Sequence, residues 1–329
     1  MKKIVVLGAG GFIGSHLVRK LKSMGNYVTG IDVKHPEFSK TQADEFCKVD
    51  ATDYNLLDKC ISADTDEIYQ LAADMGGAGY IFTGENDLNV MLNSATINLN
   101  VARIIKEKNI PMVFFSSSAC IYPEHNQMSA DNPNCEESSA YPANPDSEYG
   151  WEKLFSERLY GALARDNGTK VRVARYHNVF GPEGTWQGGK EKAPAAICRK
   201  VAVSKGSIEI WGDGRSWREF LYVDDFAKCA VNLMASCNYD DLYDGVINIG
   251  SGEDFPIETL ADIIGGIVSD NKYKLVFQIY KPQGVEFKLM DSSRIRKLGW
   301  KPKTSLQEGI KKTHAYYRAS CESGKVATG

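Results

Sequence analysis

Tyr149 and Lys153 are the residues of this chain whose types and spacing most directly predict chemistry. They are four positions apart in a segment with a helical pattern, so both side chains share one face of the predicted helix. A nearby ammonium group stabilises a phenolate, and we expect Lys153 to lower the pKa of Tyr149 from about 10 toward neutrality. Ser118 closes a run of serines after an apolar strand, where its hydroxyl can bind the same substrate oxygen. Together the three residues predict a base that deprotonates an alcohol.

Four glycines between positions 8 and 14 predict the site of the oxidant. They follow the predicted strand 4–7 and lead into the predicted helix 14–24. In that context glycines allow a tight turn, the close approach of a pyrophosphate and the packing of helix on strand. Asp32 ends the next predicted strand, where a carboxylate binds the adenosine ribose hydroxyls and repels a 2′-phosphate. The pattern therefore predicts a dinucleotide site and favours NAD over NADP.

Two further strand ends extend this predicted site. Asp50 follows the predicted strand 46–49 and can face the adenine edge, although an ordinary loop acid is the alternative interpretation. Residues 71–73 follow the fourth predicted strand and leave room for the cofactor backbone. The residues predicted to bind NAD are Gly8, Gly11, Phe12, Ile13, Gly14, Asp32, Asp50, Ala51, Leu71, Ala73, Tyr149 and Lys153.

Short β-branched or aromatic runs alternate with longer amphipathic stretches, a pattern that is typical of a parallel sheet covered on both faces. The predicted strands are 4–7, 27–32, 46–49, 67–71, 112–116, 171–175 and 246–249. Helices are predicted at 14–24, 91–108 and 149–164, the last with its lysine and glutamates on a polar face. The predicted fold class is α/β, a doubly wound parallel sheet (Rossmann) with a smaller C-terminal substrate domain.

The same pattern predicts how the chain divides into domains. We expect residues 1–180 to form the NAD-binding Rossmann domain, to which the chain returns around 215–255. Residues 181–214 and 256–329, where the pattern loosens into short elements, are expected to form the smaller domain. That domain would lie over the carboxyl ends of the strands, where open α/β sheets bind ligands.

The composition argues against several classes of protein. With 329 residues, a net charge of -3 and scattered Lys and Arg, the chain offers no basic surface for nucleic acid. No segment predicts a membrane span, and the apolar residues 4–7 run straight into glycines, unlike a signal peptide. Eight cysteines at irregular intervals predict neither a disulfide framework nor a metal site. We therefore expect a cytoplasmic protein without metal.

The glycine pattern, Asp32, the serine run and the Tyr149/Lys153 pair resemble the extended short-chain dehydrogenase/reductase family, which acts on nucleotide sugars. The resemblance covers nearly the whole chain. Segments 71–77, 117–123, 177–182 and 188–196 look like the GDP-mannose 3,5-epimerase branch of that family. Segments 211–214, 218–225, 281–284 and 288–291 read more like the GDP-fucose synthase branch. Both branches handle GDP-sugars and epimerise next to a 4-keto group.

The resemblance implies an NAD-dependent GDP-sugar epimerase. Tyr149 would take the C4 hydroxyl proton while NAD takes the C4 hydride, and the resulting ketone would make the C3 and C5 protons acidic. Cys120 and Lys192 match the family's acid/base pair, so one would remove a proton and the other return one from the opposite face. The hydride would then return to C4. The implied catalytic residues are Tyr149, Lys153, Ser118, Cys120 and Lys192.

The resemblance also implies a set of residues around the GDP-sugar. Cationic or amide side chains are natural partners of the diphosphate, and Lys288 would carry a phosphate contact where the epimerase branch has an arginine-rich segment. We interpret His177 as a satisfied core histidine and leave it out of the site. The implied substrate-binding residues are Gly76, Gly77, Ser118, Cys120, Asn178, Glu191, Lys192, Ala193, Lys200, Ser216, Arg218 and Lys288. A homodimer built on helices 91–108 and 149–164 is also implied.

Several alternatives stay open on the sequence alone. A reductase/epimerase similar to GDP-fucose synthase would consume hydride, although Asp32 argues against the NADPH that such reductases prefer. A plain GDP-sugar C4 dehydrogenase or 4-epimerase would not need Cys120 or Lys192. An inactive NAD-binding sensor would not need the intact Tyr149 and Lys153. The sugar, whether mannose, a heptose or another, and the choice between C3 and C5 are not encoded in these motifs.

Overall fold

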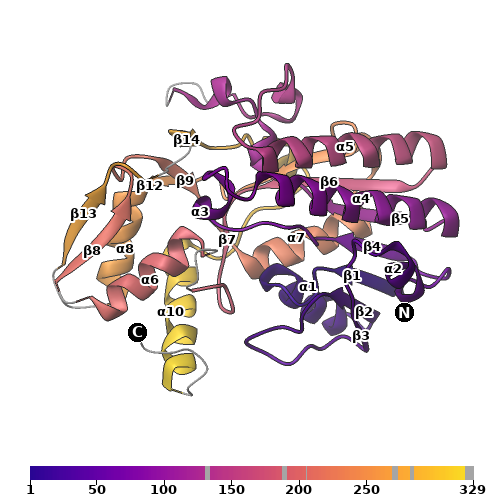
Figure 1. Ribbon diagram of the computed structural model, residues 1–329, viewed down its shortest axis with the longest axis horizontal. Helices are drawn as coiled ribbons and strands as arrows, with labels where there is room; N and C mark the ends of the chain where they lie inside the picture. The colour runs from indigo at the N-terminus through magenta and orange to yellow at the C-terminus, as the bar shows by residue number, and fades with distance from the viewer. Residues whose placement is uncertain (130–133, 187–190, 205, 269–272, 282–284, 323–329) are drawn as a thin grey trace.

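The computed structural model describes residues 1–129, 134–186, 191–204, 206–268, 273–281 and 285–322, and within them seven strands form one parallel sheet (Figure 1). The strand order is β11-β6-β5-β4-β1-β2-β3. These strands are β1 (Lys3–Leu7), β2 (Tyr27–Asp32), β3 (Glu45–Lys48), β4 (Glu67–Gln70), β5 (Met112–Ser116), β6 (Lys170–Tyr176) and β11 (Val246–Ile249). Each strand predicted from the sequence is present to within one residue at either end. The predicted doubly wound α/β fold is therefore confirmed.

The winding of the sheet reverses at β1. This strand pairs with β2, where Val6 lies opposite Gly30, and with β4, where Val6 lies opposite Tyr69. From β1 the chain builds outward to β3 on one side and to β11 on the other. The loops that leave the carboxyl ends of β1 and β4 therefore diverge, and a crevice between such loops is where open α/β sheets bind ligands.

Helices cover both faces of the sheet. On one face α4 (Asp87–Lys108) and α5 (Glu148–Asn167) lie side by side next to α2 (Tyr54–Cys60), and on the other α1 (Phe12–Ser23) packs against α7 (Val223–Ser236) (Figure 1). Leu17 of α1 and Val101 of α4 are fully buried against the strands, and each such burial contributes about 1.5–3 kcal/mol. Helix α4 begins one turn before the predicted position 91, and α5 runs on to Asn167, where Gly168 ends it in a left-handed conformation.

The prediction that α5 keeps its lysine and glutamates on a polar face is wrong. Glu152, Lys153 and Glu157 are 0%, 2% and 7% exposed. Asn98 of α4 and Ser156 donate hydrogen bonds to Glu152 at 2.9 and 2.6 Å, and Arg175 of β6 pairs with Glu157 at 2.6 Å. Buried charges need such partners, and these partners come from elements that the pattern of a single helix does not reveal.

The remaining elements include a second, smaller core. Trp186, Ile197 of α6, Ile208 of β8, Leu260 of α8 and Ile310 of α10 are buried together there, in the part of Figure 1 where α6, α8 and α10 meet. The predicted division into domains is consistent with this separate core and stays a prediction. The elements outside the large sheet and its covering helices are α3 (Ala78–Ile81), α6 (Ala193–Val203), α8 (Ile257–Val268), α9 (Ser293–Lys297), α10 (Leu306–Glu322), β7 (Val179–Phe180), β8 (Ser207–Trp211), β9 (Trp217–Glu219), β10 (Leu221–Tyr222), β12 (Asp254–Pro256), β13 (Lys274–Gln278), β14 (Phe287–Lys288) and the 3₁₀ turns η1 (Ala119–Ile121), η2 (Glu124–Gln127), η3 (Glu137–Ala140) and η4 (Tyr239–Asp241).

In the part of the chain that the structure describes, none of the helices combines the length and the apolar character that crossing a bilayer requires.

Candidate active site

A cavity of about 1080 Å³ extends from the glycine turn after β1 to α6 and β14. Every residue predicted to bind the cofactor lines it, and so does every predicted catalytic residue. Of the predicted substrate residues, Gly77 alone is not in the cavity wall. Its carbonyl instead accepts hydrogen bonds from Tyr80 and Ile81 at 2.9 and 3.1 Å, which begins α3. Of the segment 188–196 that carried part of the resemblance, residues 188–190 lie outside the described residues.

The glycine turn leaves room that side chains would fill. A β-carbon at Gly14 would lie 2.0 Å from the carbonyl oxygen of Gly8, and Gly8 itself has a φ of +81°. Helix α1 starts after Gly11 without a side-chain cap. The N–H groups of the first turn of a helix have no partner within the helix and favour anions. The turn therefore fits the pyrophosphate of a dinucleotide.

Asp32 and Asp50 stand at the ends of two neighbouring strands beside this turn. Asp32 accepts hydrogen bonds from the N–H groups of Gly10 at 2.9 Å and Lys34 at 3.1 Å, and burial raises the pKa of its carboxyl group. Because the carboxylate is held in the cavity wall, it fits the ribose hydroxyls of a bound dinucleotide. Asp50 accepts from the N–H and the hydroxyl of Thr52, at 2.9 and 2.8 Å, while it also lines the cavity.

Tyr149 is buried at the start of α5, where the geometry differs from the sequence prediction. Burial raises the pKa of Tyr149 well above its usual value, and only a hydrogen bond with Ser118 acts in the opposite direction. The Lys153 ammonium donates to the carbonyl of Ser116 at 3.0 Å and lies 5.6 Å from the centre of the Tyr149 ring. Burial also lowers the pKa of Lys153. The expected lowering of the tyrosine pKa by Lys153 is therefore not found for the protein alone.

Cys120 lies directly beside this tyrosine because Gly150 has no side chain. A β-carbon at Gly150 would be 2.2 Å from the carbonyl oxygen of Cys120, so α5 packs its backbone onto η1. Ser118 caps η1 by accepting the N–H of Cys120 at 3.1 Å. Cys120 and Tyr149 then share one apolar cluster with Ile81 of α3.

Two lysines from distant parts of the chain approach the same cysteine. Lys192, at the start of α6, donates to the carbonyl of Gly76 at 3.2 Å, and burial lowers its pKa. Lys288 of β14 donates to Sγ of Cys120 at 3.5 Å and pairs with Asp146 at 2.6 Å. The thiol therefore lies in contact with one amino group and within electrostatic range of a second. The sequence predicts a phosphate contact for Lys288, whereas the structure shows its ammonium at the thiol and at Asp146.

The residues expected at the diphosphate line the other end of the cavity. Arg218 donates to the carbonyl of Trp217 at 2.7 Å, and burial lowers its pKa to about 10. Lys200 donates to the carbonyl of Glu209 at 2.7 Å, and Asn178 to that of Glu219 at 3.3 Å. Glu191, Ala193 and Ser216 line the cavity as well. Their proposed roles remain predictions.

His177 is a residue that the sequence interpretation missed. It lines the cavity and is only 9% exposed, yet its Nε2 has no hydrogen-bond partner among the described residues. Burial, together with the charges of Lys288 and Arg218, lowers its pKa. It is therefore not a satisfied core histidine. Its position directly after β6 and before Asn178 was the signal that could have placed it in the site.

All eight cysteines are free thiols. Within the ranges that the structure describes, no group of three or more His, Cys, Asp or Glu side chains is placed to hold a metal ion.

Comparison with known proteins agrees with this geometry. Residues 4–250 match the NAD dependent epimerase/dehydratase family. The chain belongs to this family. The chain is 38% identical in sequence to GDP-mannose 3,5-epimerase of Arabidopsis thaliana. The aligned 328 residues cover 98% of this chain and 84% of the relative. It is 30% identical to probable GDP-L-fucose synthase 1 of Oryza sativa subsp. japonica over 333 residues, covering 98% and 94%.

This epimerase/dehydratase has the same fold as solved structures of other nucleotide-sugar enzymes. It superposes on a UDP-glucose 4-epimerase of Thermotoga maritima with a TM-score of 0.82 at 24% identity, covering 97% of this chain and 99% of the other. The resemblance predicted from the sequence, both to the family and to its two GDP-sugar branches, is confirmed by these similarities.

Proposed function

We propose that this protein is an NAD-dependent GDP-sugar epimerase, similar to GDP-mannose 3,5-epimerase. The observation that carries the proposal is the convergence of Tyr149, Cys120 and Lys192 in one buried cavity. An oxidising centre alone would need only the tyrosine and its cofactor. An acid and a base beside that centre are needed to exchange a carbon-bound proton. The 38% identity to GDP-mannose 3,5-epimerase supports the same assignment.

The proposed mechanism begins at Tyr149. The phenolate takes the proton of the C4 hydroxyl, and Ser118, which is hydrogen-bonded to Tyr149, orients the substrate oxygen. NAD held by the glycine turn, Asp32 and Lys153 would supply the hydride acceptor. Lys153, fixed on the carbonyl of Ser116, stabilises the phenolate once the buried hydroxyl ionises.

The second part of the mechanism takes place beside the ketone. A carbonyl at C4 makes the protons on C3 and C5 acidic because the resulting negative charge delocalises onto oxygen. Cys120 and Lys192 lie within electrostatic range of each other, so one removes such a proton and the other delivers one to the opposite face. The bound cofactor would return the hydride to C4, which would leave no net oxidation. The product is the epimer.

GDP-mannose incubated with the purified protein in deuterated water, without added reductant, tests this function. Deuterium at C3 or C5, detected by NMR, is the expected result. A 4-keto product or accumulating NADH without deuterium would point instead to a GDP-sugar C4 dehydrogenase. Consumption of NADPH on a GDP-4-keto-sugar would point to the reductase that the 30% identity to a fucose synthase favours. If the protein binds NAD tightly but converts neither GDP-mannose nor a GDP-heptose, the result would favour an inactive NAD-binding sensor.

The preference for NAD over NADP is part of the proposal and rests on Asp32. We expect Asp32→Ala to weaken NAD binding by about tenfold or more, because each lost hydrogen bond to a charged group costs about 1.5–3 kcal/mol. NADP binding should weaken less or improve, because the repulsion of the 2′-phosphate is removed. Titration calorimetry with both dinucleotides measures the ratio. An unchanged ratio would show that Asp32 does not select the cofactor.

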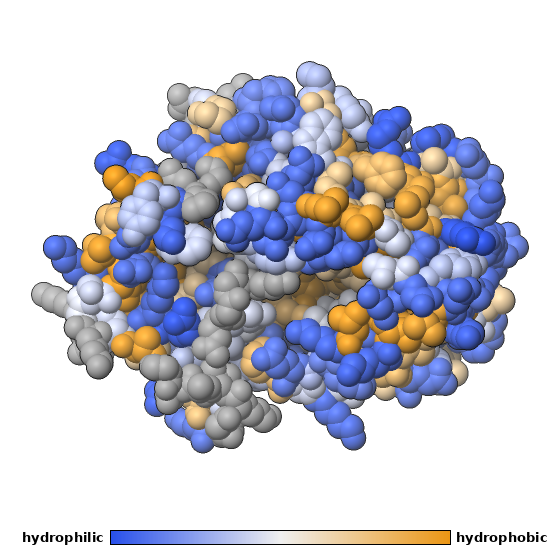
Figure 2. Space-filling model, in the orientation of Figure 1, coloured by the Kyte–Doolittle hydropathy of each residue, from blue (hydrophilic) through white to orange (hydrophobic). Residues whose placement is uncertain are grey.

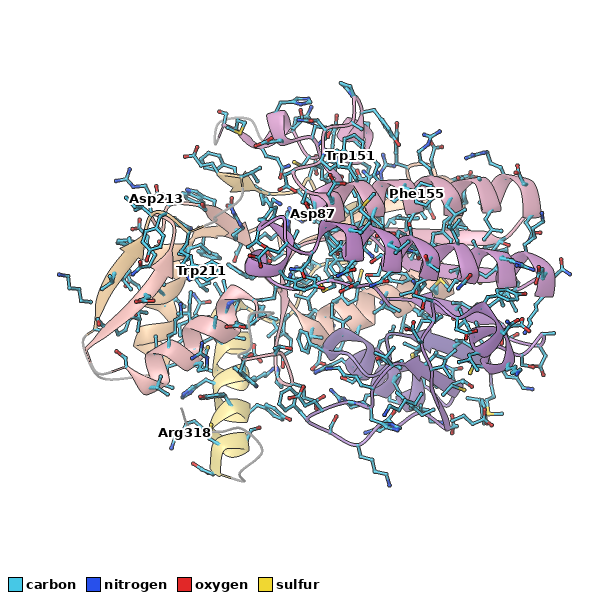
Figure 3. The ribbon with its side chains drawn as sticks, in the orientation of Figure 1. Asp87, Trp151, Phe155, Trp211, Asp213 and Arg318 are labelled. Carbon is cyan, nitrogen blue, oxygen red and sulfur yellow. The ribbon has the colours of Figure 1, made fainter. Side chains whose placement is uncertain are left out.

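A homodimer through α4 and α5 is also proposed, on the basis of an apolar stripe. Leu88, Leu92 and Leu99 of α4 are 75%, 58% and 47% exposed, and Trp151 and Phe155 of α5 are 40% and 47% exposed. Figure 2 shows hydrophobic side chains gathered over these two helices, and Figure 3 shows Trp151 and Phe155 along α5. An exposed apolar patch of this kind is typical of an interface.

Leu92→Glu combined with Phe155→Glu is therefore expected to convert the dimer into a monomer, because two carboxylates per subunit would be buried without partners. Light scattering after size-exclusion chromatography gives the mass. Leu298→Glu, a substitution of a leucine that is 40% exposed outside this stripe, is the control and should leave the mass unchanged. A dimer that survives the double substitution would exclude this interface.

The cellular compartment is a further proposal, and the cysteines support it. Free thiols in all eight positions fit a reducing environment, and we propose the cytoplasm.

A further inference from the structure

The segment after β4 supplies a hydrogen-bond partner for Lys192. Residues 71–77 connect β4 to α3, and Asp74, Met75 and Gly76 line the cavity. The Gly76 carbonyl accepts a hydrogen bond from the amino group of Lys192 at 3.2 Å. Lys192 is the N-cap residue of α6, a helix of the smaller core. The contact therefore links the end of a strand in the large sheet to the smaller core.

Tyr80 of α3 fixes the residue that carries this carbonyl. Its hydroxyl donates a hydrogen bond to Oδ1 of Asp74 at 2.9 Å. Burial and the contact with that carboxylate raise the pKa of Tyr80, so the hydroxyl stays protonated and remains the donor. A β-carbon at Gly76 would lie 2.6 Å from the β-carbon of Tyr80, so the tyrosine side chain packs directly on Gly76. The chain is thereby closed on itself between positions 74 and 80.

Helix α4 holds Asp74 from the other side. The Asn93 amide donates to Oδ2 of Asp74 at 2.9 Å. The backbone N–H of Asp74 donates to Oγ of Ser94, a side chain that is fully buried, at 3.0 Å. Both carboxylate oxygens of Asp74 thus accept from groups of the protein itself. The pattern gives this carboxylate of the cavity wall a role in holding the segment in place.

We propose that Asp74 and Tyr80 are positioning residues, which hold the Gly76 carbonyl where it orients the amino group of Lys192 in the cavity. This inference rests on the proposed function and deepens it, and it is independent of whether Lys192 removes or returns the proton. A lysine amino group is carried on a flexible four-carbon chain, so its place depends on what it binds. A group that transfers a proton must lie within hydrogen-bond reach of it.

Tyr80→Phe tests the proposal, because it removes the hydroxyl and leaves the ring that packs on Gly76. Deuterium exchange at C3 or C5 should become about tenfold slower, since a displacement of about 1 Å at a reacting group costs up to about 10²-fold. Oxidation at C4, followed by stopped-flow absorbance of NADH, should stay within a few-fold of the unsubstituted rate, because Tyr149 is untouched. Equal losses in both rates would show a general structural role and would overturn the proposal.

Tyr54→Phe is the matched control. The Tyr54 hydroxyl also donates to a carboxylate, that of Glu107, but Tyr54 lies in α2 and outside the cavity wall. Both rates should be unchanged in this variant.

Two substitutions of Asp74 separate positioning from chemistry by its carboxylate. Asp74→Ala removes the partner of both Tyr80 and Asn93, and exchange should fall by about 10²-fold. Asp74→Asn should keep most of the exchange rate, because an amide oxygen accepts from Asn93 while the amide nitrogen donates to the tyrosine oxygen. Circular dichroism checks that both variants are folded. A loss in Asp74→Asn as large as in Asp74→Ala would mean that the negative charge itself is needed, which would contradict a positioning role.

Acetylation of Lys192 by acetic anhydride, in the holoenzyme without substrate, is a readout that needs no turnover. Mass spectrometry of the Lys192 peptide should show several-fold faster labelling in Tyr80→Phe and Asp74→Ala, because the amino group is no longer held on the Gly76 carbonyl. Lys228 of α7, whose side chain is 50% exposed outside the cavity wall, is the internal control. An unchanged rate at Lys192 in both folded variants would overturn the inference. Faster labelling in a protein that exchanges no deuterium would reject the epimerase function and keep the inference.

Discussion

Tyr149→Phe is expected to lower the rate of C4 oxidation by about 10²–10⁴-fold, the usual contribution of a positioned acid or base. The substitution removes the hydroxyl that is hydrogen-bonded to Ser118 and leaves a ring of the same shape in the apolar cluster with Ile81. Folding and NAD binding should therefore be retained. Deuterium exchange should fall as far as oxidation does, because no ketone forms to acidify the carbon-bound protons.

Tyr160→Phe is the matched control for this substitution. Tyr160 lies on the same helix, is fully buried, and donates its hydroxyl to Asn98 at 3.1 Å, outside the cavity wall. Its loss should cost about 0.5–1.5 kcal/mol of stability and little activity. Stopped-flow absorbance of NADH and NMR of the product measure both variants. Oxidation at a normal rate in Tyr149→Phe would show that another group is the base.

Cys120→Ala is expected to separate the two halves of the reaction. Oxidation at C4 needs Tyr149 and the cofactor, so transient NADH should still form at a rate within a few-fold of the unsubstituted enzyme. Solvent exchange at C3 or C5 should fall by about 10²–10⁴-fold, because one member of the acid/base pair is missing. The difference between the two rates is the measurement, since a general loss of folding would lower both.

Cys47→Ala is the control for Cys120→Ala. Cys47 is a partly buried free thiol in β3 and does not line the cavity. Its removal should leave oxidation and exchange unchanged. Normal deuterium incorporation in Cys120→Ala would contradict the assignment of this thiol, and the proton would then have to be removed by Lys192.

The sheet and the cofactor end of the cavity could be predicted because their signals are local in sequence. Continuous apolar runs define the strands, and the glycines at 8–14 with Asp32 stand directly at the strand ends that they serve. Parallel strands bring such ends to the same edge of the sheet. Local patterns and the family resemblance therefore sufficed for the fold, and every residue that they predicted for the site, except Gly77, lies in the cavity wall.

The charged residues of α5 show where such reasoning stops. A lysine and two glutamates in a helix favour a solvated face, unless partners from other elements satisfy them. Here Asn98 reaches Glu152 from α4 and Arg175 reaches Glu157 from β6. Lys288 follows the same rule, because its partners Asp146 and Cys120 are 142 and 168 positions away. No pattern within one segment encodes such pairs.

The close backbone contact between α5 and η1 at Gly150 limits how the substrate specificity of this protein can change. Since a single β-carbon there would meet the carbonyl of Cys120 at 2.2 Å, the helix that carries the tyrosine and the turn that carries the thiol share one rigid wall. Neither group can be moved toward a sugar of another size without moving the other. Variation in substrate must then come from other parts of the cavity wall, such as the start of α6, where Lys192 lies. The ketone, formed next to the wall that also carries Cys120, would have no need to leave the site before its neighbouring carbon exchanges a proton.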